Sequence, residues 1–115
     1  MASTQIKKFT ASHKFARIAP RKARLVADMI RGKGIEDALA TLEFSPRRGA
    51  WFIKTVLRSA IANAEEANLD VGRLFVSETR VDEGPTIKRF QPKDRGRSHP
   101  IMKRTSHIHV AVDVR

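Results

Sequence analysis

Apolar residues recur at helical spacing in two short segments near the start of the chain. The first is Pro20–Arg31, where Pro20 suits the first helical position and Gly32 suits the position just past the last turn. Its apolar face consists of Ala23, Val26, Ala27 and Ile30. The second segment, Ile35–Phe44, carries acidic residues in its first turn, which complement the positive end of a helix dipole. Both segments are predicted to be helices.

A third and longer helix is predicted for residues 46–67. Ser45 and Pro46 provide an N-cap and a first helical residue. Gly49 lies inside this segment, where glycine costs up to ~1 kcal/mol relative to alanine. The predicted buried stripe consists of Trp51, Ile53, Val56, Leu57, Ala60, Ile61, Ala64 and Ala67.

The C-terminal third is rich in residues that favour strands. Residues 107–114 alternate between an apolar face and a more polar face, which is typical of a half-buried strand. Residues 73–81 predict a second strand, and residues 8–18 can supply a third. The expected fold class is therefore α+β, with three helices packed on a small three-stranded antiparallel sheet.

Residues 84–104 interrupt this pattern between two predicted strands. The segment holds Gly84, Pro85, Pro92, Gly96 and Pro100, and both of its ends contain strand-compatible residues. We interpret it as a long β-hairpin whose arms extend ~30 Å beyond the core, at ~3.3 Å per residue. Length predicts a single domain spanning residues 1–115, with a globular core (1–83 and 105–115) and an extended basic hairpin (84–104).

Charge indicates the kind of partner. The formal net charge is +11, and it concentrates in two segments. Residues 1–24 hold seven cations and no acid, and residues 84–104 hold seven cations and one acid. Two acid-poor segments flanking a nearly neutral middle predict a polyanionic partner, usually nucleic acid. A two-stranded ribbon is marginally stable alone, so an anionic partner is expected to hold the hairpin in shape.

Two predicted helices begin with cations, although the positive end of a helix dipole favours acids. Arg21, Lys22 and Arg24 open the first helix, and Arg47 and Arg48 open the third. Free N–H groups combined with nearby cations form a phosphate-binding arrangement, so we expect phosphate contacts at both helix starts.

Composition argues against most other classes of protein. The absence of cysteine excludes disulfides, thiolate nucleophiles and cysteine-based zinc sites. No apolar run approaches a membrane span, and no secretory signal is present, so we expect an intracellular protein without a membrane partner. His107, His109 and Asp113 lie on one strand, which is a poor metal cage, and no nucleophile has an identifiable base. We predict no metal, no cofactor and no enzymatic activity.

Three ordered motifs resemble the bacterial L22 (uL22) family of large-subunit ribosomal proteins. They are RKARLVADMIRG at residues 21–32, VLRSAIANAE at 56–65 and VDEGPTIKR at 81–89. The sequences RGR at 95–97 and KRTSHI at 103–108 follow in the same order. The resemblance runs from about Phe15 to Val112.

The resemblance implies a structural constituent of the large ribosomal subunit that binds large-subunit (23S-type) rRNA during assembly. The globular part would lie near the polypeptide exit site, and the hairpin tip would line the nascent-chain exit tunnel. Implied partners are rRNA, neighbouring large-subunit proteins and the nascent polypeptide, without homo-oligomerisation. The implied location is a bacterial-type ribosome, in the cytoplasm or in an organelle.

The candidate site residues combine the charge pattern with this resemblance. The expected rRNA-binding residues are Lys14, Arg17, Arg21, Lys22, Arg24, Arg47, Arg48, Lys88, Arg89, Lys93, Lys103 and Arg104. The expected tunnel-lining tip is Asp94, Arg95, Gly96, Arg97 and Ser98. Asp94 departs from the basic pattern of the family at this tip, and Pro100 restrains the returning strand.

The residues alone leave two other classes open. One is an architectural DNA-binding protein with β-ribbon arms, which would act as a dimer and insert a proline at the arm tip. Here Pro92 and Pro100 flank the tip instead. The other class is an RNA-processing enzyme, which would need a catalytic constellation that the sequence does not display.

Overall fold

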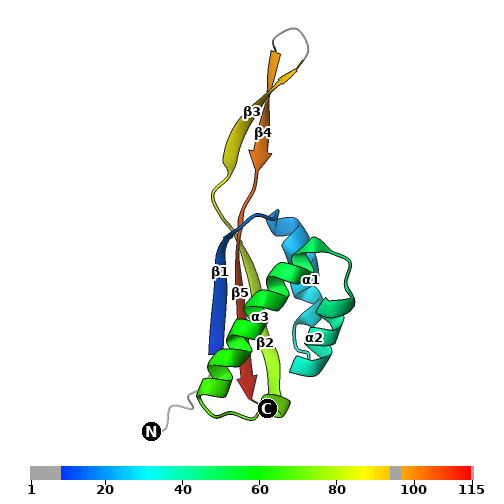
Figure 1. Ribbon diagram of the computed structural model, residues 1–115, viewed down its shortest axis with the longest axis vertical. Coiled ribbons are helices and arrows are strands. Elements are labelled where there is room, and N and C mark those ends of the chain that lie inside the picture. The colour runs from blue at the N-terminus through cyan, green and yellow to red at the C-terminus, as the bar shows by residue number, and fades with distance from the viewer. Residues whose placement is uncertain (1–8, 94–96, 115) are drawn as a thin grey trace.

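The computed structural model describes residues 9–93 and 97–114, with residues 87–102 described through their backbone pairing. The predicted α+β class is confirmed: helices cover one face of a three-stranded antiparallel sheet, and a separate hairpin projects from one end (Figure 1). The elements are β1 (Phe9–Ala16), α1 (Pro20–Ile30), α2 (Ile35–Phe44), α3 (Arg48–Glu66), β2 (Leu74–Glu83), β3 (Ile87–Lys93), β4 (Arg97–Lys103) and β5 (Ser106–Val114), with a 3₁₀ turn at Val71–Arg73.

The core sheet has the order β1-β5-β2, so the last strand lies in the middle. Val76 on β2 pairs with Val112 on β5, and both side chains are fully buried. The helices α1 and α3 pack on the same face of the sheet, α1 mainly over β2 and α3 over β1 and β5. Apolar burial between these two layers holds the core together.

Helix α1 has the predicted beginning, and it ends at Ile30, one residue before the predicted Arg31. Pro20 is its first residue, and Gly32 follows the C-cap with a φ of 82°, a left-handed conformation that glycine adopts without steric cost. Gly49 in α3 also has a structural reason. A Cβ there would lie 3.2 Å from the Ile18 and Val26 side chains, so glycine allows α1 and α3 to approach closely.

Two expectations about α3 were wrong. The helix begins at Arg48, because Arg47 has extended backbone angles, and Ser45 is instead the C-cap of α2. Trp51 is 62% exposed, and Phe52 occupies the buried position in its place. The other expected stripe positions, from Ile53 to Ala64, are buried, whereas Ala67 at the far end is an exposed C-cap.

The hairpin pairs in a continuous register from Ile87 opposite Lys103 to Lys93 opposite Arg97. Its strands form their own two-stranded sheet beyond the end of the core, as predicted (Figure 1). The molecule therefore extends 68 Å along its longest axis, with a radius of gyration of 17.6 Å. A compact chain of this length would have a radius of gyration of about 13 Å.

Candidate nucleic-acid interface

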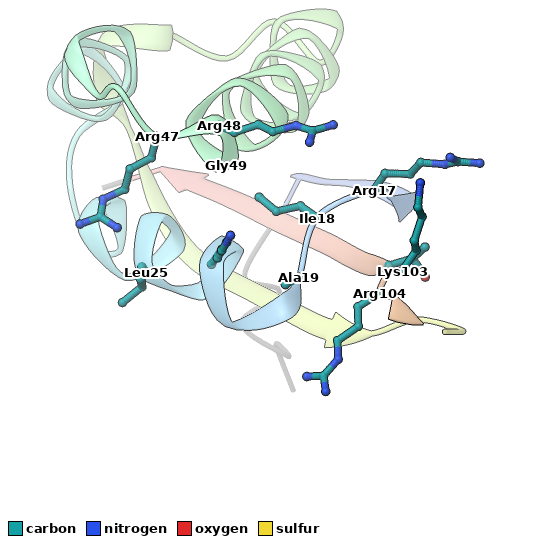
Figure 2. A pocket seen from close by; sticks show the side chains of 11 residues that line it. Arg17, Ile18, Ala19, Leu25, Arg47, Arg48, Gly49, Lys103 and Arg104 are labelled. Carbon is teal, nitrogen blue, oxygen red and sulfur yellow. The ribbon is translucent and has the colours of Figure 1, made fainter. Parts of the chain in front are cut away.

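A groove of about 730 Å³ lies where the hairpin joins the core (Figure 2). We call it the neck groove. It collects residues from the β1–α1 linker, the start of α1, the start of α3 and the β4–β5 junction. They are Arg17, Ile18, Ala19, Lys22, Leu25, Arg47, Arg48, Gly49, Lys103, Arg104 and Thr105.

Strand register and helix packing together bring these four segments to one place. Ala16 at the end of β1 pairs with Ser106 at the start of β5, so Arg17 lies near Lys103 and Arg104. The close approach of α1 and α3 at Gly49 places both helix starts on the same groove.

The charge of the groove has one sign. Among the residues that the structure describes, its lining includes six cationic side chains and no acidic one. Ala19 and Arg47, the N-cap residues of α1 and α3, make no side-chain capping hydrogen bond. The positive ends of two helix dipoles therefore add to the field of the cations, which suits a polyanion.

The side chains spread along the groove instead of converging on one point. Arg17 and Arg48 extend in the same direction, while Arg47 extends toward the opposite side, where Leu25 lies (Figure 2). Ile18 and Leu25 add apolar surface between the charges. This arrangement fits an extended ligand that carries several negative charges better than a single small anion.

Hydrogen bonds fix the neck beside the groove. The Gly84 N–H donates to the Thr105 carbonyl at 2.9 Å, and the Thr105 hydroxyl donates to the Pro85 carbonyl at 2.6 Å. The buried Ser106 hydroxyl donates to the Ile18 carbonyl at 2.6 Å. The neck, made of Gly84, Pro85 and Thr105, thus joins the hairpin to the core through a hydrogen-bonded and closely packed junction.

The predicted cations have different environments. Arg17, Lys22, Arg47, Arg48, Lys103 and Arg104 line the neck groove. Lys14 on β1 and Arg21 on α1 are exposed but are not among the residues that line it. Lys88, Arg89 and Lys93 are on β3, and Arg97 and Ser98 are on β4. Asp94, Arg95 and Gly96 lie outside the described residues.

Arg24 has a structural contact that the sequence did not reveal. Its Nε and Nη2 atoms donate to the carbonyl oxygen of Val81 at 3.2 and 3.0 Å. The guanidinium therefore ties α1 to β2. A carbonyl that accepts from an arginine is satisfied without loss of the positive charge, so Arg24 still contributes to the basic surface.

The outer face of the sheet holds an arrangement that sequence reasoning missed. Ser12 Oγ lies 2.7 Å from His109 Nδ1, and His109 Nε2 lies 3.3 Å from Asp82 Oδ2. We expected no nucleophile with an identifiable base, and the position of His109 beside the Ser12 hydroxyl shows that this expectation was wrong. Ser12 and His109 are direct partners in the β1–β5 register, so the contact is one of the cross-strand pairs that stabilise a sheet.

The histidines considered for a metal are engaged by protein groups. His107 Nδ1 accepts from the Phe15 N–H at 3.1 Å, and the Asp113 carboxylate accepts from the Val114 N–H. Within residues 9–93 and 97–114, no group of three potential ligands gathers for a metal ion. None of the helices in that part of the chain is long and apolar enough to cross a membrane.

Comparison with known proteins decides the family. The profile of ribosomal protein L22p/L17e matches residues 11–113. The chain belongs to the ribosomal protein L22 family. It is similar to the large ribosomal subunit protein uL22 of Lacticaseibacillus casei, with 56% identity over 94% of this chain and 93% of that protein.

Other bacterial relatives agree. The uL22 proteins of Ligilactobacillus salivarius and Desulfosudis oleivorans are 54% and 50% identical, over 96% and 90% of this chain and 97% and 90% of theirs. Members of the L22 family are structural constituents of the large ribosomal subunit, not enzymes, and this chain is one of them. As a member of this family, the chain associates with the ribosome, an assembly of rRNA and proteins, and acts in translation.

Proposed function

We propose that the neck groove and the hairpin are the surfaces by which this L22-family protein binds large-subunit rRNA during assembly. The observation that carries the proposal is the gathering of six cations from separate segments on one groove whose described lining holds no acid. Such a groove suits a phosphate backbone, which supplies much of the affinity of a protein for nucleic acid.

The hairpin has a second role in this proposal. Its paired strands project beyond the core sheet, so they can reach into an RNA-lined space that the globular part does not enter (Figure 1). The globular part would lie near the polypeptide exit site, and the tip, residues 94–98, would line the nascent-chain tunnel. Lys88, Arg89, Lys93 and Lys103 would then hold the arms against RNA.

The remaining partners and the location belong to the same proposal. The protein acts as a single copy, beside neighbouring large-subunit proteins and the nascent polypeptide. Its bacterial relatives support a ribosome in the bacterial cytoplasm. Lys14, Arg21 and Arg24 would extend the rRNA contact outside the groove, since Lys14 and Arg21 are exposed and Arg24 keeps its charge.

Incorporation into purified large subunits tests the groove. The groove variant, Arg17→Gln/Arg104→Gln, removes two cations from its lining. The control variant, Lys33→Gln/Arg80→Gln, removes the same charge from exposed positions that the groove does not include. We expect the stoichiometry of the groove variant in subunits to fall and that of the control variant to stay near wild type. Equal loss in both would show that net charge alone matters, and normal incorporation of both would contradict the proposed interface.

A tip deletion tests the tunnel role separately. Replacing residues 94–98 by a short turn removes the tip and the last two pairs of the hairpin, but it keeps the pairing from Ile87–Lys103 to Gln91–His99. We expect near-normal incorporation, because the groove and arms remain, together with an altered response to macrolides or altered passage of particular nascent chains. Normal incorporation with unchanged behaviour in the tunnel would refute the role of the tip.

A further inference from the structure

The chain has one tryptophan, and it lies on the surface. Trp51 is 62% exposed in the first turns of α3, although tryptophan is usually the side chain with the most apolar surface to bury. Scattered exposed apolar residues are common and need no explanation alone. The surroundings of Trp51 make it different from Phe44, which is also exposed but follows an acidic residue at the end of α2.

Neighbouring rings hold Trp51. Its ring lies edge-to-face on Phe52, with centroids 5.0 Å apart and an interplanar angle of 79°. The Phe52 ring is itself buried and contacts His13 on β1, with centroids 5.6 Å apart. Trp51 therefore stands against a fixed support, and ordering it on binding costs less than ordering a freely rotating side chain.

One cation lies against the Phe52 ring that supports Trp51. The guanidinium carbon of Arg48 lies 5.7 Å from the centroid of Phe52, on the same ring that supports Trp51. Residues 48–58 contain Arg48, Lys54 and Arg58 and no acid, and Lys54 is paired with Glu43 of α2. Arg48 also lines the neck groove, so the groove and the aromatic surface are continuous through one residue.

We propose that Trp51 stacks on an unpaired base of the RNA whose backbone lies in the neck groove. The inference rests on the proposed RNA-binding function and adds a contact to it. Any base presents a π-face to an aromatic ring, and proteins recognise unpaired RNA largely by such stacking. A protein partner covering Trp51 would have to supply an acid opposite Arg48, whereas RNA brings its own negative charge.

The test uses the fluorescence of the single tryptophan in a chain without tyrosine. The probes are a short RNA duplex and the same duplex interrupted by a bulge of unpaired uridines. We expect the bulged RNA to quench Trp51 and to shield it several-fold from acrylamide, with little shielding by the uninterrupted duplex. Trp51→Ala should weaken binding of the bulged RNA by about 5- to 150-fold, the equivalent of ~1–3 kcal/mol per stacked base.

Matched variants separate stacking from folding and from charge. Trp51→Phe keeps a ring and should retain most of the affinity for the bulged RNA, and Phe44→Ala should leave that affinity unchanged.

Two results would overturn the proposal. One is equal access of acrylamide to Trp51 with and without RNA. The other is a loss of affinity in Trp51→Ala that is equal for the bulged and the uninterrupted RNA. Normal RNA affinity combined with poor incorporation of Trp51→Ala into subunits would assign the surface to a protein partner, which also overturns it. If the groove variant binds both RNAs like wild type, the proposed function itself fails, whatever Trp51 does.

Discussion

The two sheets of this protein are stabilised in different ways. The core sheet buries Val76, Ile108 and Val110 beneath α1 and α3, so the chain supplies its own apolar layer. The β3–β4 ribbon makes its main contacts between its own two strands and projects from the core (Figure 1). A two-stranded ribbon is marginal in water, so we expect its shape to depend on what it binds. The comparison shows that one chain combines a core with its own apolar layer and an arm without one.

The junction between these regions is also where the charge gathers. The core positions four segments around the neck groove, and the groove opens beside the base of the hairpin. RNA in the groove would therefore hold the region from which the arm departs. Binding and support of the hairpin are, in this account, parts of one interaction.

The largest expected contrast is between a core truncation and removal of the arm. Leu57→Ala deletes a fully buried side chain and should lower the free energy of unfolding by ~2–5 kcal/mol. Replacing residues 87–103 by a short turn should change it by less than about 1 kcal/mol, because the Gly84–Thr105 hydrogen bond still closes the strands. Urea denaturation measures both. A large loss of stability on removing the arm would break the distinction between the two regions.

A smaller effect is expected at the neck. In Gly84→Ala the new Cβ would lie 2.5 Å from Thr105 Oγ1 and 3.3 Å from its backbone carbon, so the hydroxyl that bonds Pro85 must move. Overpacking of this kind costs ~1–3 kcal/mol. Gly72→Ala is the matched control, since its Cβ would make only an ordinary contact with Asp70. Thermal melts that show equal stability for the two variants would mean that the neck tolerates rearrangement.

The smallest effect belongs to a surface pair that links α2 and α3. The hydrogen bond and the charge of Lys54 lower the pKa of the exposed Glu43 carboxyl, and Arg58 acts in the same direction. A carboxyl with a lowered pKa stabilises the fold above its unfolded pKa, and that stability is lost as the pH falls through the folded pKa. Glu43→Gln should therefore be slightly less stable than wild type at neutral pH and equal to it in acid. Urea midpoints at the two pH values test this sign, and a difference that grows in acid would contradict it.

Local chemistry made most of the fold predictable. Helical spacing, Pro20 and Gly32 located α1, and strict alternation located β5. Trp51 was misplaced because Trp51 and Phe52 are adjacent apolar residues, and periodicity alone does not say which one faces the core. Ser45 was misassigned because it has the chemistry of an N-cap but ends the preceding helix.

The candidate site was only partly predictable. Sequence identified the cations, but their gathering depends on the β1–β5 register and on the contact of α1 with α3 at Gly49. Neither feature is local. For the same reason the bond from Arg24 to the Val81 carbonyl and the pairing of Ser12 with His109 appeared only in the folded chain.

The salt dependence of binding to large-subunit rRNA tests the central claim most directly. Neutralising about seven phosphates gives a slope of log K against log salt of roughly −5 to −6. The groove variant loses two groove cations, so its slope should be shallower by about 1.4 to 1.8, while the control variant keeps the wild-type slope. If the groove and control variants show the same slope, the cations of the neck groove do not contact phosphates and the account is wrong.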